Sequence, residues 1–274
     1  MANRVLFQSG RSKFGSLLYY ALNSLLAISV LFLIVVTNSW ILAIILTIVS
    51  KWRVFTVRPN YWWANIKANL VDFIVGISFV FLIYYAGTTE TIGLMDINWL
   101  GGNNISFAQI LLTALYAFWL LWLKVRSITW AVNLQALVAL FLGLTVFGNM
   151  LATEDSIFLV IVAFIVGFGA ARHALMNIEG DTGSLDLLFG LVTAELAWVG
   201  DHWLYAYPIP TTNLKIPQLA IITSIFAFAL IKIYSSVSLN GGKFTASAIT
   251  LPIAFSALLT IAIVVLFSNP VMGL

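Results

Sequence analysis

Apolar segments about twenty residues long recur along the whole chain, and they constrain its fold more than any other feature. A helix needs roughly 20 apolar residues to cross the hydrocarbon core of a bilayer, because each residue adds about 1.5 Å. Charged residues make up only 8% of the chain and apolar residues 62%. A soluble fold of this length cannot bury so much apolar surface. The sequence therefore predicts an all-α, polytopic integral membrane helix bundle.

We predict one transmembrane domain over residues 1–274 with about nine transmembrane helices. The second helix is the least certain, because residues 40–50 provide only eleven positions before Lys51. Residues 17–50 could instead form one long bent helix or a re-entrant hairpin. The predicted helices lie near 17–36, 40–55, 67–86, 107–124, 128–151, 156–173, 185–205, 217–236 and 245–267.

Lys and Arg are distributed unevenly between the ends of these helices. With a cytoplasmic N-terminus, twelve of the thirteen lie on the cytoplasmic side, and only Lys215 lies outside. Cytoplasmic loops of membrane proteins are enriched in these residues. The pattern predicts a cytoplasmic N-terminus, an external C-terminus and a multi-pass location in the cell membrane. The twelve are Arg4, Arg11, Lys13, Lys51, Arg53, Arg58, Lys67, Lys124, Arg126, Arg172, Lys232 and Lys243.

The composition and the missing motifs exclude several kinds of chemistry. The chain has no cysteine, so it has no disulfide, zinc–thiolate site or thiol nucleophile. It contains neither a Walker A nor an H-E-x-x-H motif. Its basic residues lie near the ends of the predicted helices. Membrane topology explains this distribution better than binding to nucleic acid does. We expect no cofactor and no nucleic-acid partner, and the pattern favours a function other than catalysis.

Glu195 lies near the middle of the predicted helix 185–205. An ionisable residue at that depth is costly, faces protein or water, and commonly has a function. Trp198 and His202 follow at i+3 and i+7, so the three share one helix face. This arrangement predicts either a path for a proton or a polar tie to another helix. The candidate partners of such a tie are Asn133, Gln135 and Asn149.

Asp72 lies in the inner third of the predicted helix 67–86. We expect it to pair with Lys67 or to line a vestibule that opens to the cytoplasm.

Three further acids, Glu179, Asp181 and Asp186, lie close together in the sequence near Arg172 and His173. We interpret this cluster as a solvated loop. A small divalent-metal site is its other interpretation, although no typical metal motif supports one.

Small residues on two neighbouring helices indicate that these helices pack together. Gly167, Gly169 and Ala170 lie on the helix 156–173, and Gly190 and Ala194 on the helix 185–205. Small side chains let two helix backbones approach closely.

Three functional hypotheses follow. The first is a small permease or ion-coupled carrier, with Glu195 and His202 on the pathway and Asp72 at an inner vestibule. The second is a non-catalytic membrane subunit that scaffolds a larger membrane assembly. The third is an intramembrane enzyme that uses the acids between Glu179 and Asp186. The partners expected are the lipid bilayer and either further copies of this chain or other membrane subunits.

Overall fold

The computed structural model describes residues 13–87, 97–99, 103–150, 156–179, 184–203, 205–210, 212–243 and 245–267. In this part of the chain, ten α-helices account for most residues, and four short strands form two pairs. The helices are α1 (Lys13–Thr37), α2 (Ile41–Val49), α3 (Trp62–Ala68), α4 (Leu70–Tyr85), α5 (Phe107–Phe118), α6 (Thr129–Met150), α7 (Ser156–Glu179), α8 (Leu185–Trp203), α9 (Gln218–Leu239) and α10 (Ala246–Phe267).

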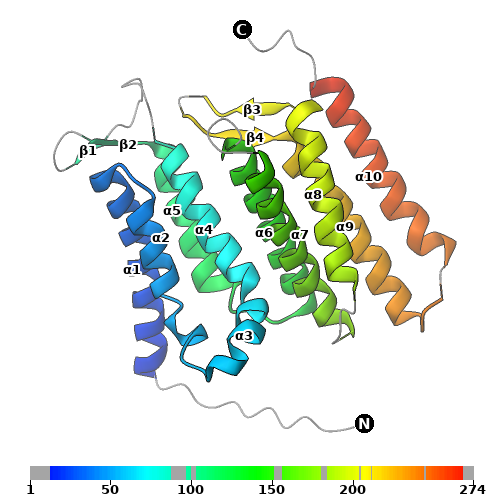
Figure 1. Cartoon of the computed structure of the whole chain (residues 1–274), viewed down its shortest axis with the longest axis horizontal. Helices are drawn as coiled ribbons and strands as arrows, with labels where there is room; N and C mark the ends of the chain where they lie inside the picture. Colours follow the sequence, from blue (N-terminus) through cyan, green and yellow to red (C-terminus); the bar gives the residue numbers. More distant parts are fainter. Residues whose placement is uncertain are drawn as a thin grey trace.

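The long helices lie side by side with similar axes, and consecutive ones run in opposite directions (Figure 1). The two strand pairs lie at one end of the bundle, and α3 lies at the other. β1 (Ile97–Trp99) pairs antiparallel with β2 (Asn103–Ile105), and β3 (Ala206–Pro208) with β4 (Lys215–Pro217). Both pairs lie between predicted helices, and in the second pair Pro208 and Pro217 favour extended backbone.

Each of the nine predicted ranges overlaps a helix, but several bounds differ from the prediction. The sixth, predicted at 156–173, extends to Glu179, and the fourth, predicted at 107–124, is α-helical to Phe118 and then forms a π-helical turn over Trp119–Leu123. The second, predicted at 40–55, ends at Val49 and continues as a 3-10 turn over Trp52–Val54. The third begins at Leu70 and is bent by 65° from the helical segment before it. The all-α class is confirmed apart from the two strand pairs.

Residues 17–50 form two antiparallel helices, not one long bent helix. Asn38 has a positive φ of 47°, a conformation that asparagine tolerates better than most residues. The chain reverses there, and α2 returns beside α1 (Figure 1). With nine residues, α2 rises only about 13 Å.

Five of the described helices are long and apolar enough to cross a membrane: α1, α6, α7, α9 and α10. The bent segment Pro59–Ala68 with Leu70–Tyr85 gives a sixth candidate. α8 is of similar length but carries three acids, Asp186, Glu195 and Asp201. These helices are compatible with a membrane-embedded protein.

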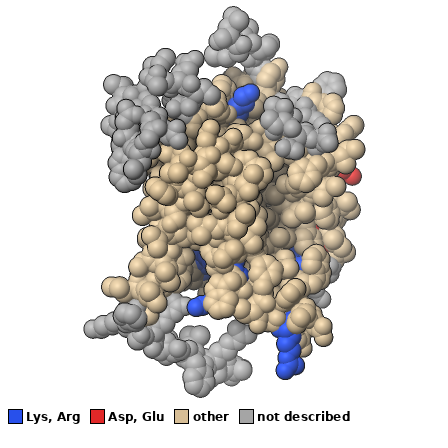
Figure 2. All heavy atoms as spheres, turned by 60° about the vertical axis from the view of Figure 1, so that its left-hand side comes forward, with Lys and Arg blue, Asp and Glu red and all other residues tan. Residues whose placement is uncertain are grey.

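The outer surface of the bundle is apolar. On α10, Leu251 is 75% and Leu258 68% exposed, although each side chain is purely hydrocarbon. Figure 2 shows one face as a broad uncharged area, with most Lys and Arg atoms in its lower part. A surface of this kind suits a hydrocarbon environment better than water.

Helix α6 forms the centre of the packing, between α4, α7 and α9. Its side chains Ala139, Leu140, Leu144 and Phe147 are almost fully buried. Gly143 lets α7 approach, because a Cβ atom there would lie 2.7 Å from both γ-carbons of Val166.

The predicted packing of the small-residue helices, α7 and α8, is confirmed. A Cβ atom at Gly167 would lie 2.4 Å from Thr193 Oγ1, and one at Gly190 would lie 3.0 Å from the Phe164 ring. Both glycines therefore stand where the two helices come closest.

We predict that Gly143→Ala destabilises the protein by about 1–3 kcal/mol, because the added methyl group overlaps Val166. Val166→Ala removes both clashing carbons. The double variant Gly143→Ala/Val166→Ala should therefore be more stable than the sum of the two single effects predicts. Thermal unfolding in detergent measures the three variants, and strictly additive losses would contradict this packing.

Candidate functional site

The outward face of α8 presents Glu195 without a partner. The Glu195 side chain is exposed, and it has no hydrogen bond or ion pair to any residue that the structure describes. Leu191 and Trp198, on the same side of the helix, are 54% and 58% exposed. A carboxylate therefore stands within an apolar outer face.

His202 shares this face, as the i+7 spacing predicts, and it is exposed. Its Nδ1 lies 2.9 Å from the Trp198 carbonyl oxygen, and the two rings lie 5.3 Å apart. Because a carbonyl oxygen only accepts, Nδ1 carries the proton. Trp198 and His202 thus form one ordered aromatic pair beside the carboxylate.

The amide side chains considered as partners of Glu195 are engaged elsewhere or isolated. Gln135 Nε2 donates to the carbonyl oxygens of Leu123 at 2.6 Å and Arg126 at 2.9 Å, and its Oε1 lies 2.7 Å from His173 Nε2. Gln135 therefore ties the α5–α6 connection to α7. Asn133 Oδ1 is buried and has no hydrogen-bond partner among the described residues.

Asn149 exchanges two hydrogen bonds with the backbone of Lys215, at 2.7 and 2.8 Å. These bonds attach the end of α6 to β4. Asn149 therefore stabilises the strand-bearing end of the bundle and does not contact Glu195.

Asp72 lies between two lysines that are distant in sequence. Lys51 Nζ is 2.5 Å and Lys124 Nζ 2.7 Å from Asp72 Oδ2, and Lys51 also donates to the Asp72 carbonyl oxygen at 2.8 Å. Lys51 is buried and Asp72 is half-buried, whereas the Lys124 side chain is 37% exposed. Lys67, the partner considered from sequence, lies 5.4 Å from the Trp63 ring centre instead. The cluster joins the segment after α2, the start of α4 and the end of the π-helical turn Trp119–Leu123 that follows α5.

Asp186 pairs with Arg172, whose Nη1 lies 2.9 Å from Asp186 Oδ2. Asp186 is almost fully buried, and its Oδ1 accepts the backbone N–H of Leu187 at 2.8 Å. Asp181 and the Glu179 side chain lie outside what the structure describes. Among the described residues, no three His, Asp or Glu side chains are placed to hold a metal ion. Asp186 thus closes the α7–α8 connection by a buried ion pair, not in a solvated loop.

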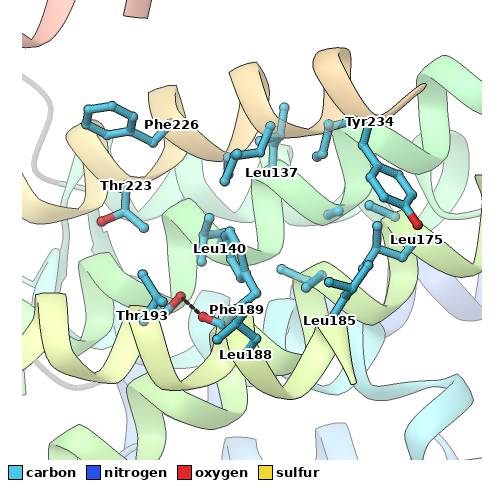
Figure 3. A pocket seen from close by; sticks show the side chains of 18 of the residues that line it. Leu137, Leu140, Leu175, Leu185, Leu188, Phe189, Thr193, Thr223, Phe226 and Tyr234 are labelled. Atoms are coloured by element: carbon cyan, nitrogen blue, oxygen red, sulfur yellow. Dashed lines mark hydrogen bonds between the residues drawn. The ribbon is translucent and has the colours of Figure 1, made fainter. Parts of the chain in front are cut away.

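A cavity of about 520 Å³ lies between α6, α7, α8 and α9. Figure 3 shows Thr223 and Phe226 toward one end of it and Leu175, Leu185 and Tyr234 toward the other. Its only polar lining residues are Thr193, Thr223 and Tyr234. A second apolar cavity, of about 600 Å³, lies between α4, α5, α6 and α9.

No protein-family model matches this chain, and neither does any curated protein or any solved structure. The assignment of function therefore depends on geometry. The carboxylates of Asp72 and Asp186 each face a basic side chain of the same molecule. Glu195 has no such neighbour, and it lines neither of the two cavities described above. Among the carboxylates whose side chains the structure describes, Glu195 is the one without a basic partner.

We predict that Asp72→Asn lowers the free energy of unfolding by about 3–5 kcal/mol, because it leaves the buried Lys51 charge unpaired. The double variant Asp72→Asn/Lys51→Met removes both charges of the pair and should recover part of that loss. Thermal unfolding of the purified variants tests the cluster. If the double variant is no more stable than Asp72→Asn, the pair is not what holds α2 to α4.

Proposed function

We propose that this protein is a non-catalytic subunit of a larger membrane assembly, and that the outward face of α8 contacts another chain. We call this surface the α8 contact face and define it by Leu191, Glu195, Trp198 and His202. The observation that carries the proposal is the exposed, unpartnered Glu195 in the middle of an apolar helix.

A carboxylate in this position has a physical need for a partner. Placing a charged side chain at the centre of a membrane helix costs about 2.5–3.5 kcal/mol on insertion scales. A neighbouring helix that supplies a Lys, an Arg or another hydrogen-bond donor at the same depth removes most of that cost. Trp198 supplies the large, exposed aromatic side chain that commonly anchors protein interfaces.

A second copy of this chain is a poor partner for the α8 contact face. In a two-fold dimer about the membrane normal, both copies of Glu195 would meet at the same depth, and like charges repel. Most Lys and Arg residues of the described elements lie at or beyond helix ends. Lys232 and Arg172 lie seven residues inside the ends of α9 and α7, and Arg172 is already paired with Asp186. The complementary group therefore belongs to a different protein.

The geometry supports the subunit hypothesis better than the carrier hypothesis. A carrier that uses Glu195 needs this residue on an internal pathway. Both cavities described above are lined by apolar side chains, and Glu195 lines neither of them. Asp72 is held between two lysines instead of lining an open vestibule. The enzyme hypothesis used Glu179, Asp181 and Asp186. Of their side chains the structure describes only that of Asp186, and it forms an ion pair with Arg172.

We further propose that the chain crosses the cell membrane nine times, with its N-terminus in the cytoplasm. Nine consecutive segments alternate in direction, with the short α2 and its 3-10 turn as the second (Figure 1). The ends of these segments that lie beside α3 carry the clustered Lys and Arg residues, whereas Lys215 lies on β4 at the opposite end. This asymmetry supports the proposed orientation.

The absence of cysteine allows a direct test of orientation, because a single introduced cysteine is the only thiol. We expect Lys215→Cys to react with a membrane-impermeant maleimide in intact cells. Asn240→Cys, in the α9–α10 connection, should react only after the membrane is permeabilised. The reverse pattern, or equal labelling of both, would contradict the orientation.

The α8 contact face can be tested by photocrosslinking in living cells. With p-benzoylphenylalanine in place of Trp198, we expect a covalent adduct with one defined membrane protein. Adding Glu195→Leu, which removes the carboxylate, should reduce that adduct at least tenfold.

The matched control places the same crosslinker at Phe158, an exposed aromatic position on α7. It should not yield this adduct, and the thermal stability of Glu195→Leu should match that of the parent. An adduct at position 198 that is unaffected by Glu195→Leu would refute the role of the carboxylate.

A further inference from the structure

We infer that the cavity between α6, α7, α8 and α9 is a binding site for one long, uncharged lipid chain that carries a single carbonyl or hydroxyl group. This inference uses other residues than the α8 contact face, because Leu191, Glu195, Trp198 and His202 do not line the cavity. We call it the α8–α9 cleft.

The shape of the cleft suits a chain. It follows α9 from Thr223 to Val237, and 14 residues at about 1.5 Å each give a length of about 21 Å. This length exceeds half of the roughly 30 Å hydrocarbon core of a bilayer. Its volume of about 520 Å³ lies within the range of small-molecule sites.

The walls of the cleft differ in exposure. Its floor consists of Ala136, Leu140, Ala170 and Ala174, all buried, from α6 and α7. Its rim includes Leu188 on α8 and Leu230 on α9, which are 57% and 51% exposed. The cleft therefore opens sideways between α8 and α9, toward the space that lipid occupies in the proposed membrane arrangement.

The lining determines which class of ligand fits. No Asp, Glu, Lys, Arg or His is among the lining residues, so a charged group inside the cleft would have no counter-charge. The occupant within the cleft is therefore uncharged. An apolar lining also gives water too few hydrogen bonds to fill the space.

Thr223 indicates where the polar group of the ligand lies. Its side chain is directed toward the cleft (Figure 3), and the residue is only 3% exposed. Its Oγ1 has no hydrogen-bond partner among the described residues. Thr193, the other threonine of the lining, differs because its Oγ1 donates to the Phe189 carbonyl oxygen at 2.8 Å. A buried hydroxyl without a partner is costly, and a ligand carbonyl or hydroxyl would satisfy it.

The test uses two photoreactive probes with the same diazirine-bearing alkyl chain, one an alcohol and the other a plain alkane. Purified protein in lipid discs is illuminated with each probe, and the labelled peptides are identified by mass spectrometry. We expect the alcohol probe to label cleft residues of α8 and α9 preferentially. Equal labelling of the exposed side chains of α10 would overturn the inference, since it would indicate bulk lipid contact.

Two variants separate the apolar and polar parts of the site. Ala227→Phe fills the cleft and should reduce labelling by both probes at least tenfold, whereas Ala254→Phe, which adds the same ring on exposed α10, should not. Thr223→Val keeps the side-chain shape and removes the hydroxyl, so it should weaken binding of the alcohol about fivefold, as expected for one hydrogen bond of about 1 kcal/mol. Binding of the alkane should not change.

Unchanged labelling of Ala227→Phe would overturn the site itself. An equal effect of Thr223→Val on both probes would overturn the hydrogen bond to the ligand. Thermal unfolding of each variant identifies losses that come from misfolding, and Thr223→Ser, which retains a hydroxyl, should bind the alcohol as the parent does.

Discussion

The close approach of α6, α7 and α8 is the interaction on which the rest of the fold depends. Glycines at positions 143, 167 and 190 stand where a Cβ atom would meet a neighbouring helix. In hydrocarbon, helices gain little from burying apolar surface, because lipid tails are as apolar as leucine. Close backbone packing and buried polar contacts must therefore hold them together. The other helices pack around this centre.

The ion pairs between the described residues lie at the end of the bundle that carries α3. There Asp72 joins α2, α4 and α5 through two lysines, and Arg172 joins α7 to α8 through Asp186. Gln135 adds a link from the α5–α6 connection to His173. Asp72, Asp186 and Gln135 thus each have a partner within the same chain. Glu195 differs, because the same fold that satisfies these acids leaves it on the outside.

The sequence was sufficient to predict the positions of most helices, because most are long apolar runs bounded by polar residues. The short α3 was not predicted. The sequence was also not sufficient to predict where α2 ends, since a short apolar run does not distinguish an α-helix from one that tightens into a 3-10 turn. The partners of Asp72 were also missed. Lys51 lies 21 residues before it and Lys124 lies 52 residues after it, and no local pattern connects them.

Helix spacing placed Glu195, Trp198 and His202 on one face, and the structure retains that arrangement. The direction of the face could not be predicted. Leu187, Leu191 and Val199 are exposed on α8 while Thr193 and Ala197 are buried, so apolar side chains occur on both sides of the helix. Thr223 gave no signal at all, because one hydroxyl in an apolar helix is ordinary until its surroundings are known.

The most direct test of the central claim is the protein composition of the particle extracted into native lipid discs, measured as its intact mass. The account predicts this 30.2 kDa chain together with at least one different membrane protein at a fixed ratio. A particle that contains only this chain, as a monomer or as a symmetric oligomer, would contradict it. Glu195 would then have to act without a protein partner, and the carrier hypothesis would regain the stronger position.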